Sequence, residues 1–165
     1  MTHVNQIVVI GASAGGIDAL RTLTAALPSE FPAPICIVLH TPPQSPGMLP
    51  DILSRSGPLT ATNARNDERI RAGHIYVAPP DCHLIAEPGK LCVTKGPKEN
   101  RFRPAIDPLF RSAAQIYGPG TIGVLLTGSL DDGTAGLHSS RGSQAAIRCD
   151  PASGDDARGP PARDK

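Results

Sequence analysis

Three residues that can together activate a nucleophile each follow an apolar segment of this chain. Ser13, His40 and Asp132 come after residues 7–10, 35–39 and 121–126 respectively. A serine hydroxyl is a poor nucleophile near neutral pH, but an imidazole can take its proton and a carboxylate can fix the imidazole's tautomer. These residue types predict nucleophilic catalysis by a Ser-His-Asp triad, provided that the fold brings them together.

Ser13 stands in the sequence Gly-Ala-Ser-Ala-Gly over residues 11–15, which fits the G-x-S-x-G pattern of a nucleophile elbow. A serine at such a turn from a strand into a helix lies beside backbone N–H groups that can stabilise an oxyanion. The chain order Ser, His, Asp differs from the Ser, Asp, His order of the α/β-hydrolases. The alternative is a small residue tolerated in a tight turn, because short motifs often match by chance.

The same glycine-rich turn has a competing interpretation as a nucleotide site. The dinucleotide fingerprint G-x-G-x-x-G requires a glycine at the position of Ser13 and an acidic residue at the end of the second strand, where His40 stands. Ser13 and His40 both argue against a dinucleotide site, but a nucleotide-binding α/β domain stays open as an alternative hypothesis. Taken singly, His40 could be packed under the proline-rich loop 41–46, and Asp132 could be a turn or helix-capping residue.

Composition narrows the classes of partner. A net charge of +1 and an aromatic content of 3% argue against nucleic acid and against an anionic membrane surface. No apolar run is long enough to cross a bilayer and no signal segment opens the chain, so we expect a cytoplasmic protein without membrane insertion. The 4 cysteines show no zinc-binding spacing, and we read the cluster at residues 81–83 as structural. We therefore expect neither a metal nor a cofactor.

The elements that must position the triad are strands alternating with helices. We expect helices over residues 16–27, 48–54 and 106–117, and strands over residues 7–10, 35–39, 59–64, 75–78 and 121–126, with a hairpin at 83–87 and 91–95. This order predicts an α/β fold: a doubly wound, mostly parallel sheet with an inserted antiparallel hairpin, in a Rossmann-like three-layer sandwich. Ligands bind beyond the carboxyl ends of such strands, where the triad residues would meet.

Several stretches resemble one known family in the family's own order. They are residues 10–16, 38–43, 73–84, 96–114 and 125–137. The chain resembles the catalytic domain of the chemotaxis-receptor methylesterases (CheB type), which implies hydrolysis of glutamate γ-methyl esters on methylated receptors and, in some members, glutamine deamidation.

The resemblance also implies roles for particular residues. Ser13 would be the nucleophile, His40 the general base and acid, and Asp132 the orienting carboxylate, while backbone N–H groups of Ala14 and Ser129 would bind the oxyanion. Residues 99–101 and 103–104 would either shape the rim of the site or form a buried structural ion pair.

The match weakens towards the C-terminus. Leu130 stands where the family has a glycine, and residues 138–165 hold a single large aliphatic side chain, Ile147. We therefore expect a catalytic domain over 1–137 and a poorly ordered tail over 138–165, as in a truncated or frame-shifted chain. With 6 residues before the first strand, no receiver domain is expected. The alternative function is an inactive remnant that acts at most as a binding module.

Overall fold

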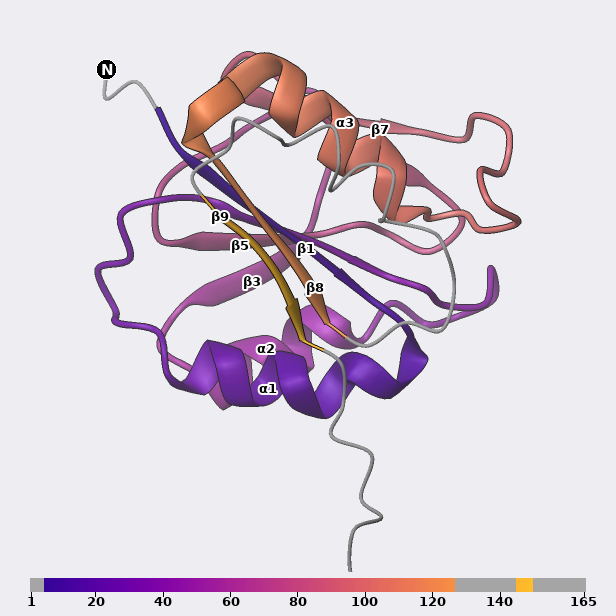
Figure 1. Cartoon of the computed structure of the whole chain (residues 1–165). Coiled ribbons are helices and arrows are strands. Elements are labelled where there is room, and N and C mark those ends of the chain that lie inside the picture. Colours follow the sequence, from indigo (N-terminus) through magenta and orange to yellow (C-terminus); the bar gives the residue numbers. More distant parts are fainter. Residues whose placement is uncertain (1–4, 127–144, 150–165) are drawn as a thin grey trace, which may run out of the picture.

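The computed structural model describes residues 5–126 and 145–149, and its main element is a 6-stranded sheet. Neighbouring strands are all parallel, in the order β3-β5-β2-β1-β8-β9 (Figure 1). Their bounds are β1 (Ile7–Ala12), β2 (Ile35–Leu39), β3 (Thr60–Asn63), β5 (His74–Val77), β8 (Thr121–Leu126) and β9 (Ala145–Cys149). The predicted α/β fold with a mostly parallel sheet is confirmed.

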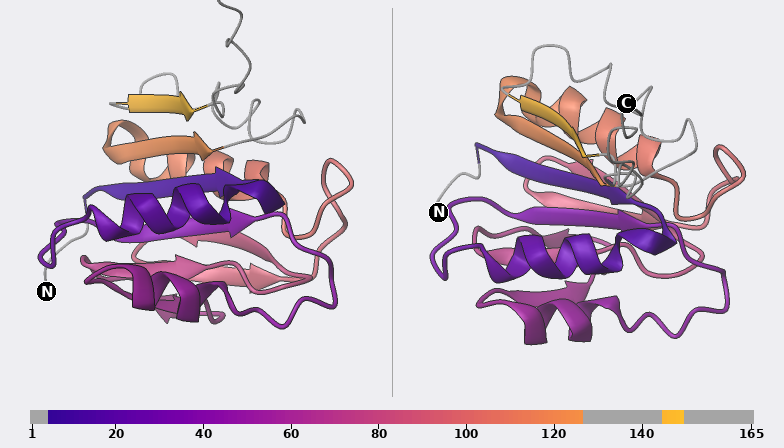
Figure 2. Two further views of the ribbon diagram at one scale, coloured as in Figure 1. Left: turned by 90° about the horizontal axis from the view of Figure 1, so that it is seen from below. Right: turned by 60° about the horizontal axis from the view of Figure 1, so that its bottom comes forward.

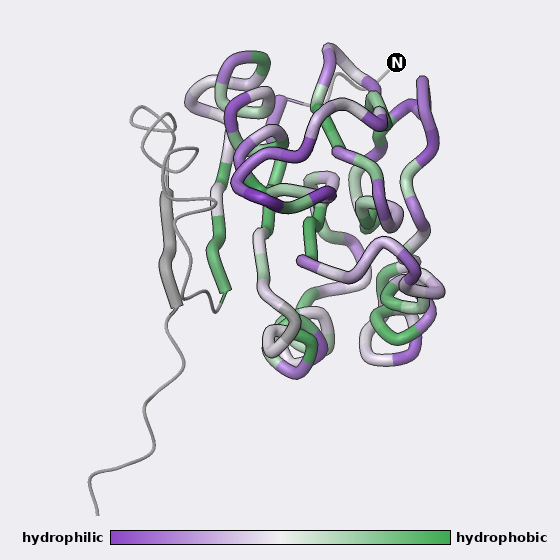
Figure 3. The backbone as a smooth tube through the Cα atoms, turned by 90° about the vertical axis from the view of Figure 1, so that its right-hand side faces the viewer, coloured by the Kyte–Doolittle hydropathy of each residue, from purple (hydrophilic) through white to green (hydrophobic). Residues whose placement is uncertain are grey.

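The central strands are apolar on both faces because both faces of the sheet are covered. Every residue of β1 and β2 is buried. Alternate side chains of β1 point to opposite faces, so Ile7 and Val9 join one core cluster while Val8 and Ile10 join the other. In Figure 3 the hydrophobic stretches of the tube lie mainly in the strands, and hydrophilic stretches lie in the loops around them.

Helices pack on the two faces of the sheet. The helices α1 (Ile17–Ala25) and α2 (Leu49–Ser56) lie together below the sheet, and α3 (Ile106–Tyr117) lies above it (Figure 1). Two short 3-10 turns, η1 (Ala14–Gly16) and η2 (Gly118–Gly120), join β1 to α1 and α3 to β8. This is the doubly wound arrangement that the alternation of strands and helices predicts.

The predicted hairpin belongs to a second, 3-stranded antiparallel sheet with the order β4-β7-β6. Its strands are β4 (Glu68–Arg69), β6 (His83–Glu87) and β7 (Lys90–Thr94). The hairpin is tied to α3 by the backbone N–H of Ala86, which donates to Ser112 Oγ at 2.9 Å. The second sheet and α3 therefore cover the same face of the main sheet.

One edge of the main sheet is formed by β9, which pairs in parallel with β8 (Figure 2). The strand lies within residues 138–165, where we expected a poorly ordered tail, so this part of the chain adds a strand to the sheet. The rest of that expected tail lies outside the described residues. The division into a catalytic domain over 1–137 and a poorly ordered tail over 138–165 stays a prediction.

The first glycine of the G-x-S-x-G sequence has a packing role. A Cβ at Gly11 would lie 2.5 Å from Ile106 Cγ2, at the first residue of α3. Such a contact is shorter than side chains tolerate, so a glycine here lets the start of α3 pack directly on β1. By contrast, a Cβ at Gly15 would meet nothing within 4 Å.

Candidate active site

Ser13 lies at the carboxyl end of β1, in the turn that leads into α1. Its backbone is extended, with φ −86° and ψ 174°, and the N–H of Gly16 donates to its carbonyl oxygen at 2.8 Å. A nucleophile elbow requires a strained turn at the serine, and this backbone is unstrained. The G-x-S-x-G pattern is therefore met in the sequence, but the elbow geometry that it led us to expect is not present.

His40 lies beside the end of β1, directly after β2. The strands β1 and β2 stay in register up to Ala12 and Leu39, and the N–H of His40 donates to the carbonyl oxygen of Ala12 at 2.9 Å. This bond fixes His40 next to the residue that precedes Ser13. The fold thus brings together two residues that are 27 positions apart in the chain, at the carboxyl edge where the sequence places them.

Ser13 and His40 line the same pocket, which has a volume of about 440 Å³. The other lining residues are Thr41, Pro42, Pro43, Lys98, Arg101, Phe102 and Arg103. Two prolines and a phenylalanine make the pocket largely apolar, and the basic side chains of Lys98 and Arg101 stand exposed at it. An apolar pocket with a few polar groups can hold a small uncharged group such as an ester while its rim attracts negative charge.

The aromatic ring of Phe102 lies flat on the imidazole of His40. The ring centroids are 3.8 Å apart and the ring planes differ by 3°. His40 is only 8% exposed, so most of its ring is shielded from solvent. Phe102 is not among the predicted site residues, although the residues on both sides of it are. The available signal was a rare aromatic residue between two arginines, in a chain with 3 phenylalanines.

Phe102 belongs to an irregular stretch over residues 97–105, called the wall segment below. His83 holds both of its ends: its Nε2 donates to the carbonyl oxygen of Pro97 at 2.8 Å, and its Nδ1 accepts the N–H of Ala105 at 3.2 Å. The assigned roles require the neutral tautomer with hydrogen on Nε2. His83 is 3% exposed, which agrees with the structural role expected for residues 81–83.

Arg103 fixes the middle of the wall segment to the end of the main sheet. Its Nη2 lies 2.7 Å from Asp81 Oδ1 and its Nε donates to the same oxygen at 2.9 Å, while Nη1 donates to the carbonyl oxygen of Gly96 at 3.0 Å. The pKa of Asp81 lies below its ordinary value mainly because Arg103 donates a hydrogen bond to the carboxylate. Arg101 and Arg103 therefore line the pocket, and Arg103 also forms an ion pair with Asp81 whose side chains are partly exposed.

A tight turn at Asn100 and Arg101 directs Phe102 towards His40. Both residues have positive φ, 50° and 71°, and Glu99 and Phe102 exchange backbone hydrogen bonds across the turn at 3.1 and 2.8 Å. Asn100 Nδ2 donates to Asp107 Oδ2 at 2.9 Å, and Asp107 is buried in the first turn of α3. Asparagine tolerates left-handed backbone, so this turn is fixed by its residue type and by α3.

The other candidate residues are described less fully. Ala14 is the first residue of η1 and so follows Ser13 at the candidate site. Asp132, Ser129 and Leu130 lie outside the described residues. The last register pair of β1 and β8 joins Ala12 to Leu126, so the chain leaves β8 at the edge where Ser13 lies.

The described residues hold neither a metal-binding cluster nor a membrane-spanning helix. No group of 3 or more His, Cys, Asp and Glu side chains there could hold a metal ion. Burial raises the pKa of the Cys36 thiol well above its usual value, so this cysteine stays protonated. Within residues 5–126 and 145–149, no helix has the length and apolar character to cross a bilayer.

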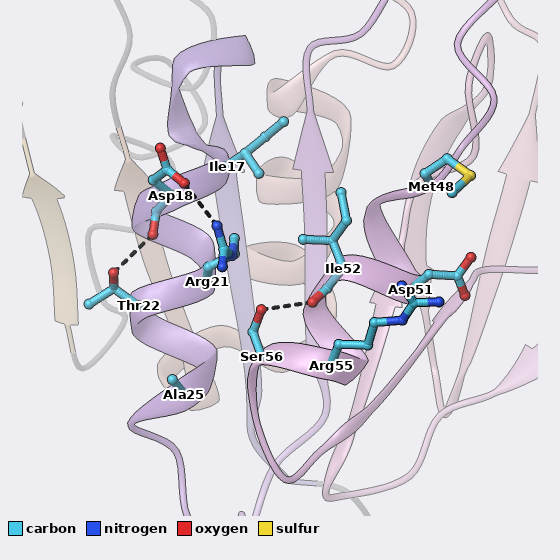
Figure 4. A pocket seen from close by; sticks show the side chains of 10 residues that line it. All are labelled: Ile17, Asp18, Arg21, Thr22, Ala25, Met48, Asp51, Ile52, Arg55 and Ser56. Atoms are coloured by element: carbon cyan, nitrogen blue, oxygen red, sulfur yellow. Dashed lines mark hydrogen bonds and ion pairs between the residues drawn. The ribbon is translucent and has the colours of Figure 1, made fainter.

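A larger hollow lies elsewhere, between α1 and α2, with a volume of about 850 Å³. It is called the helix groove below, and its lining residues are Ile17, Asp18, Arg21, Thr22, Ala25, Met48, Asp51, Ile52, Arg55 and Ser56 (Figure 4). Its one serine donates its hydroxyl to the carbonyl oxygen of Ile52 at 2.8 Å, and no histidine lines it. The smaller pocket therefore has the chemistry of an active site.

Comparison with known proteins gives a consistent result. A family model described as CheB methylesterase matches residues 8–154. A Leptospira interrogans protein, provisionally named a protein-glutamate methylesterase/protein-glutamine glutaminase, is 41% identical over 133 residues, which cover 80% of this chain and 69% of that protein. A Photorhabdus laumondii protein with the same two activities in its name is 40% identical over 136 residues, but the match covers only 39% of its length.

A solved structure is similar over most of the chain. It is the CheB methylesterase catalytic domain of Thermotoga maritima, with a TM-score of 0.79 and 39% sequence identity over 86% of this chain and 77% of that one. Like the family model, which extends to residue 154, the comparison reaches past the boundary expected at residue 137.

Proposed function

The chain belongs to the CheB methylesterase family, and on this premise we propose that it hydrolyses glutamate γ-methyl esters on methylated chemotaxis receptors. The substrate side chains would lie on the cytoplasmic helices of those receptors, so the reaction takes place in the cytoplasm. The observation that carries the proposal is the meeting of Ser13 and His40 in one largely apolar pocket at the carboxyl edge of the sheet. Parallel α/β sheets bind their ligands at this edge.

The reaction runs through an acyl-enzyme. His40 takes the proton of Ser13 as Oγ attacks the ester carbonyl, and the C–O bond to the methoxy group breaks when His40 returns the proton to the leaving methanol. Water then attacks the acyl-enzyme with His40 again as the base, which releases the glutamate carboxylate and restores Ser13. Asp132 orients the imidazole, and backbone N–H groups of Ala14 and Ser129 stabilise the oxyanion.

The same residues can act on a glutamine side chain. Attack by Ser13 on the amide expels ammonia in place of methanol, and the acyl-enzyme and its hydrolysis are unchanged. This second activity needs His40 to protonate a poorer leaving group, so we expect it to be slower than ester hydrolysis.

The test follows methanol release from receptor that carries labelled methyl esters. We expect release with the wild-type protein and its loss in Ser13→Ala. The matched control is Ser56→Ala in the helix groove, which removes a hydroxyl of the same type and should leave release unchanged. Far-UV circular dichroism and a melting curve establish that each protein is folded.

Two results would contradict the proposal. Release that persists in folded Ser13→Ala would show that another group is the nucleophile. A folded wild-type chain that binds receptor without releasing methanol would favour the binding module, the alternative function that the C-terminal departures from the family support.

A further inference from the structure

We propose that Phe102 is a positioning residue for His40: its ring holds the imidazole in place and stabilises the imidazolium that forms when His40 takes the proton of Ser13. The inference rests on the proposed function for its catalytic consequence. The contact itself, rings 3.8 Å apart and 3° from parallel, is independent of that function.

The geometry of the stack suits a charged imidazole better than a neutral one. Neutral aromatic pairs prefer offset or edge-to-face arrangements with centroids about 4.5–7 Å apart, because their negative faces repel each other. A centroid separation of 3.8 Å between nearly parallel planes instead places the imidazole over the face of Phe102. A cation is attracted to that face, so the contact becomes most favourable at the moment when His40 is protonated.

Burial strengthens this effect. A cation–π contact is worth more where water is excluded, and His40 is 8% exposed beneath the phenylalanine. Thr41, Pro42 and Pro43 line the same pocket and contribute to its apolar character. The charge on His40 is thus formed on a ring that is largely shielded from solvent, and the ring of Phe102 is the aromatic surface that lies against it.

The protein fixes Phe102 from both sides, as positioning requires. Before it, the turn at Asn100 and Arg101 is closed by backbone hydrogen bonds and tied to Asp107. After it, Arg103 is bound to Asp81 and to the carbonyl oxygen of Gly96. A ring that merely filled space would not need bonds from two separate elements to hold its neighbours.

The experiment compares Phe102→Leu with Phe102→Tyr. Leucine keeps an apolar side chain but removes the aromatic face, and tyrosine keeps that face. With methyl-labelled receptor as substrate, we expect Phe102→Leu to lower kcat by about 3- to 30-fold with little change in KM, and Phe102→Tyr to stay close to the wild type. An unchanged kcat in the leucine variant, or an equal fall in both variants, would overturn the proposal.

A second measurement does not depend on activity. In NMR spectra, a proton of the His40 ring above Phe102 should be displaced upfield by the ring current, and this displacement should vanish in Phe102→Leu and persist in Phe102→Tyr. Absence of the displacement in the wild type would overturn the proposal even if the leucine variant fails to fold. A wild-type protein with the displacement but without methanol release would instead refute the proposed function and leave the placement of the imidazole standing.

Discussion

Two hollows in the described part of this molecule are built in different ways. The helix groove lies between two regular helices that approach closely: Leu20 of α1 and Leu53 of α2 are fully buried in one core cluster, and Gly57 lies against the backbone of Thr24. The pocket that Ser13 and His40 line is about half the size and is bordered by the irregular wall segment, which donates hydrogen bonds to His83, Asp81 and Asp107.

The difference shows why the size of a pocket is a poor guide to the candidate active site. Apolar packing of two helices leaves space wherever their ridges diverge, without placing any particular group in it. Directional hydrogen bonds fix an irregular segment in one position, and catalysis requires that kind of precision. We therefore expect substitutions around the helix groove to change stability with little effect on chemistry, and substitutions in the wall segment to do the reverse.

The largest expected effect on stability comes from Gly57→Ala, next to the helix groove. A Cβ at this position would lie 2.2 Å from the carbonyl oxygen of Thr24 in α1, so α1 and α2 must move apart. Overpacking of this kind costs about 1–3 kcal/mol, which in a chain of this size lowers the melting temperature by about 2–4 °C per kcal/mol. Thermal unfolding followed by circular dichroism measures the change.

Its control is Gly15→Ala, where an added Cβ meets nothing within 4 Å and the melting temperature should not change. Methanol release per folded molecule should be the same in Gly57→Ala as in the wild type at a temperature well below its transition. A loss of release without a loss of stability would break the distinction between the two regions.

The second-largest effect is expected for Arg103→Met, and it is an effect on activity. Methionine keeps an unbranched apolar stem but cannot bind Asp81 or the carbonyl oxygen of Gly96, so the wall segment and Phe102 lose their fixed position over His40. A looser wall segment weakens the contact of Phe102 with His40, so we expect kcat/KM for methanol release to fall by about 3- to 30-fold, the range expected for Phe102→Leu. The melting temperature should change less than in Gly57→Ala.

Arg111→Met is the matched control for this substitution. Arg111 also pairs with a carboxylate, that of Glu99 at 2.7 Å, but both side chains are substantially exposed. Exposed ion pairs contribute little to stability, so release should remain near the wild-type rate. Equal losses of activity in Arg103→Met and Arg111→Met would show that the loss does not depend on the place of Arg103 in the wall segment.

The sequence predicted the helices and strands that depend on local patterns of apolar residues. The periodicity over residues 106–117 and the apolar run 121–126 coincide with α3 and β8, and the meeting of Ser13 with His40 follows because parallel strands end at one edge of their sheet. The expected helix 16–27 ends earlier, at Ala25. Its apolar pattern continues to Leu27, but Pro28 disfavours helical backbone in the residue before it.

The wall segment could not be predicted in the same way. Its position depends on residues from two separate places in the fold, the stretch that holds Asp81 and His83 and the start of α3 that holds Asp107, and no local pattern connects these residues with Phe102. The strand β4 was missed because it has only 2 residues, too few to show an alternation. The predicted role of Asp132 stays a prediction, since it lies outside the described residues.

The smallest effect separates the charge of the Arg103–Asp81 pair from its shape. Asp81 has positive φ, 58°, which asparagine also tolerates, so Asp81→Asn removes the charge with little change in the backbone. The hydrogen bond from Arg103 lowers the pKa of Asp81, while partial burial opposes this shift. The charged carboxylate is therefore the form that the folded state favours.

The sign of the pH dependence follows from this. A lowered pKa contributes stability that is fully present above the ordinary value of 3.8 and is lost as the pH falls through the lower value of the folded state. The difference in unfolding free energy between the wild type and Asp81→Asn, measured by urea denaturation, should hold steady from pH 7 to pH 5 and shrink below about pH 4. In the Arg103→Met background, where the donor is missing, Asp81→Asn should lose most of this pH dependence. A gap that persists unchanged down to pH 3 would mean that shape rather than charge holds the wall segment, and the contrast with the apolar packing around the helix groove would then be one of geometry alone.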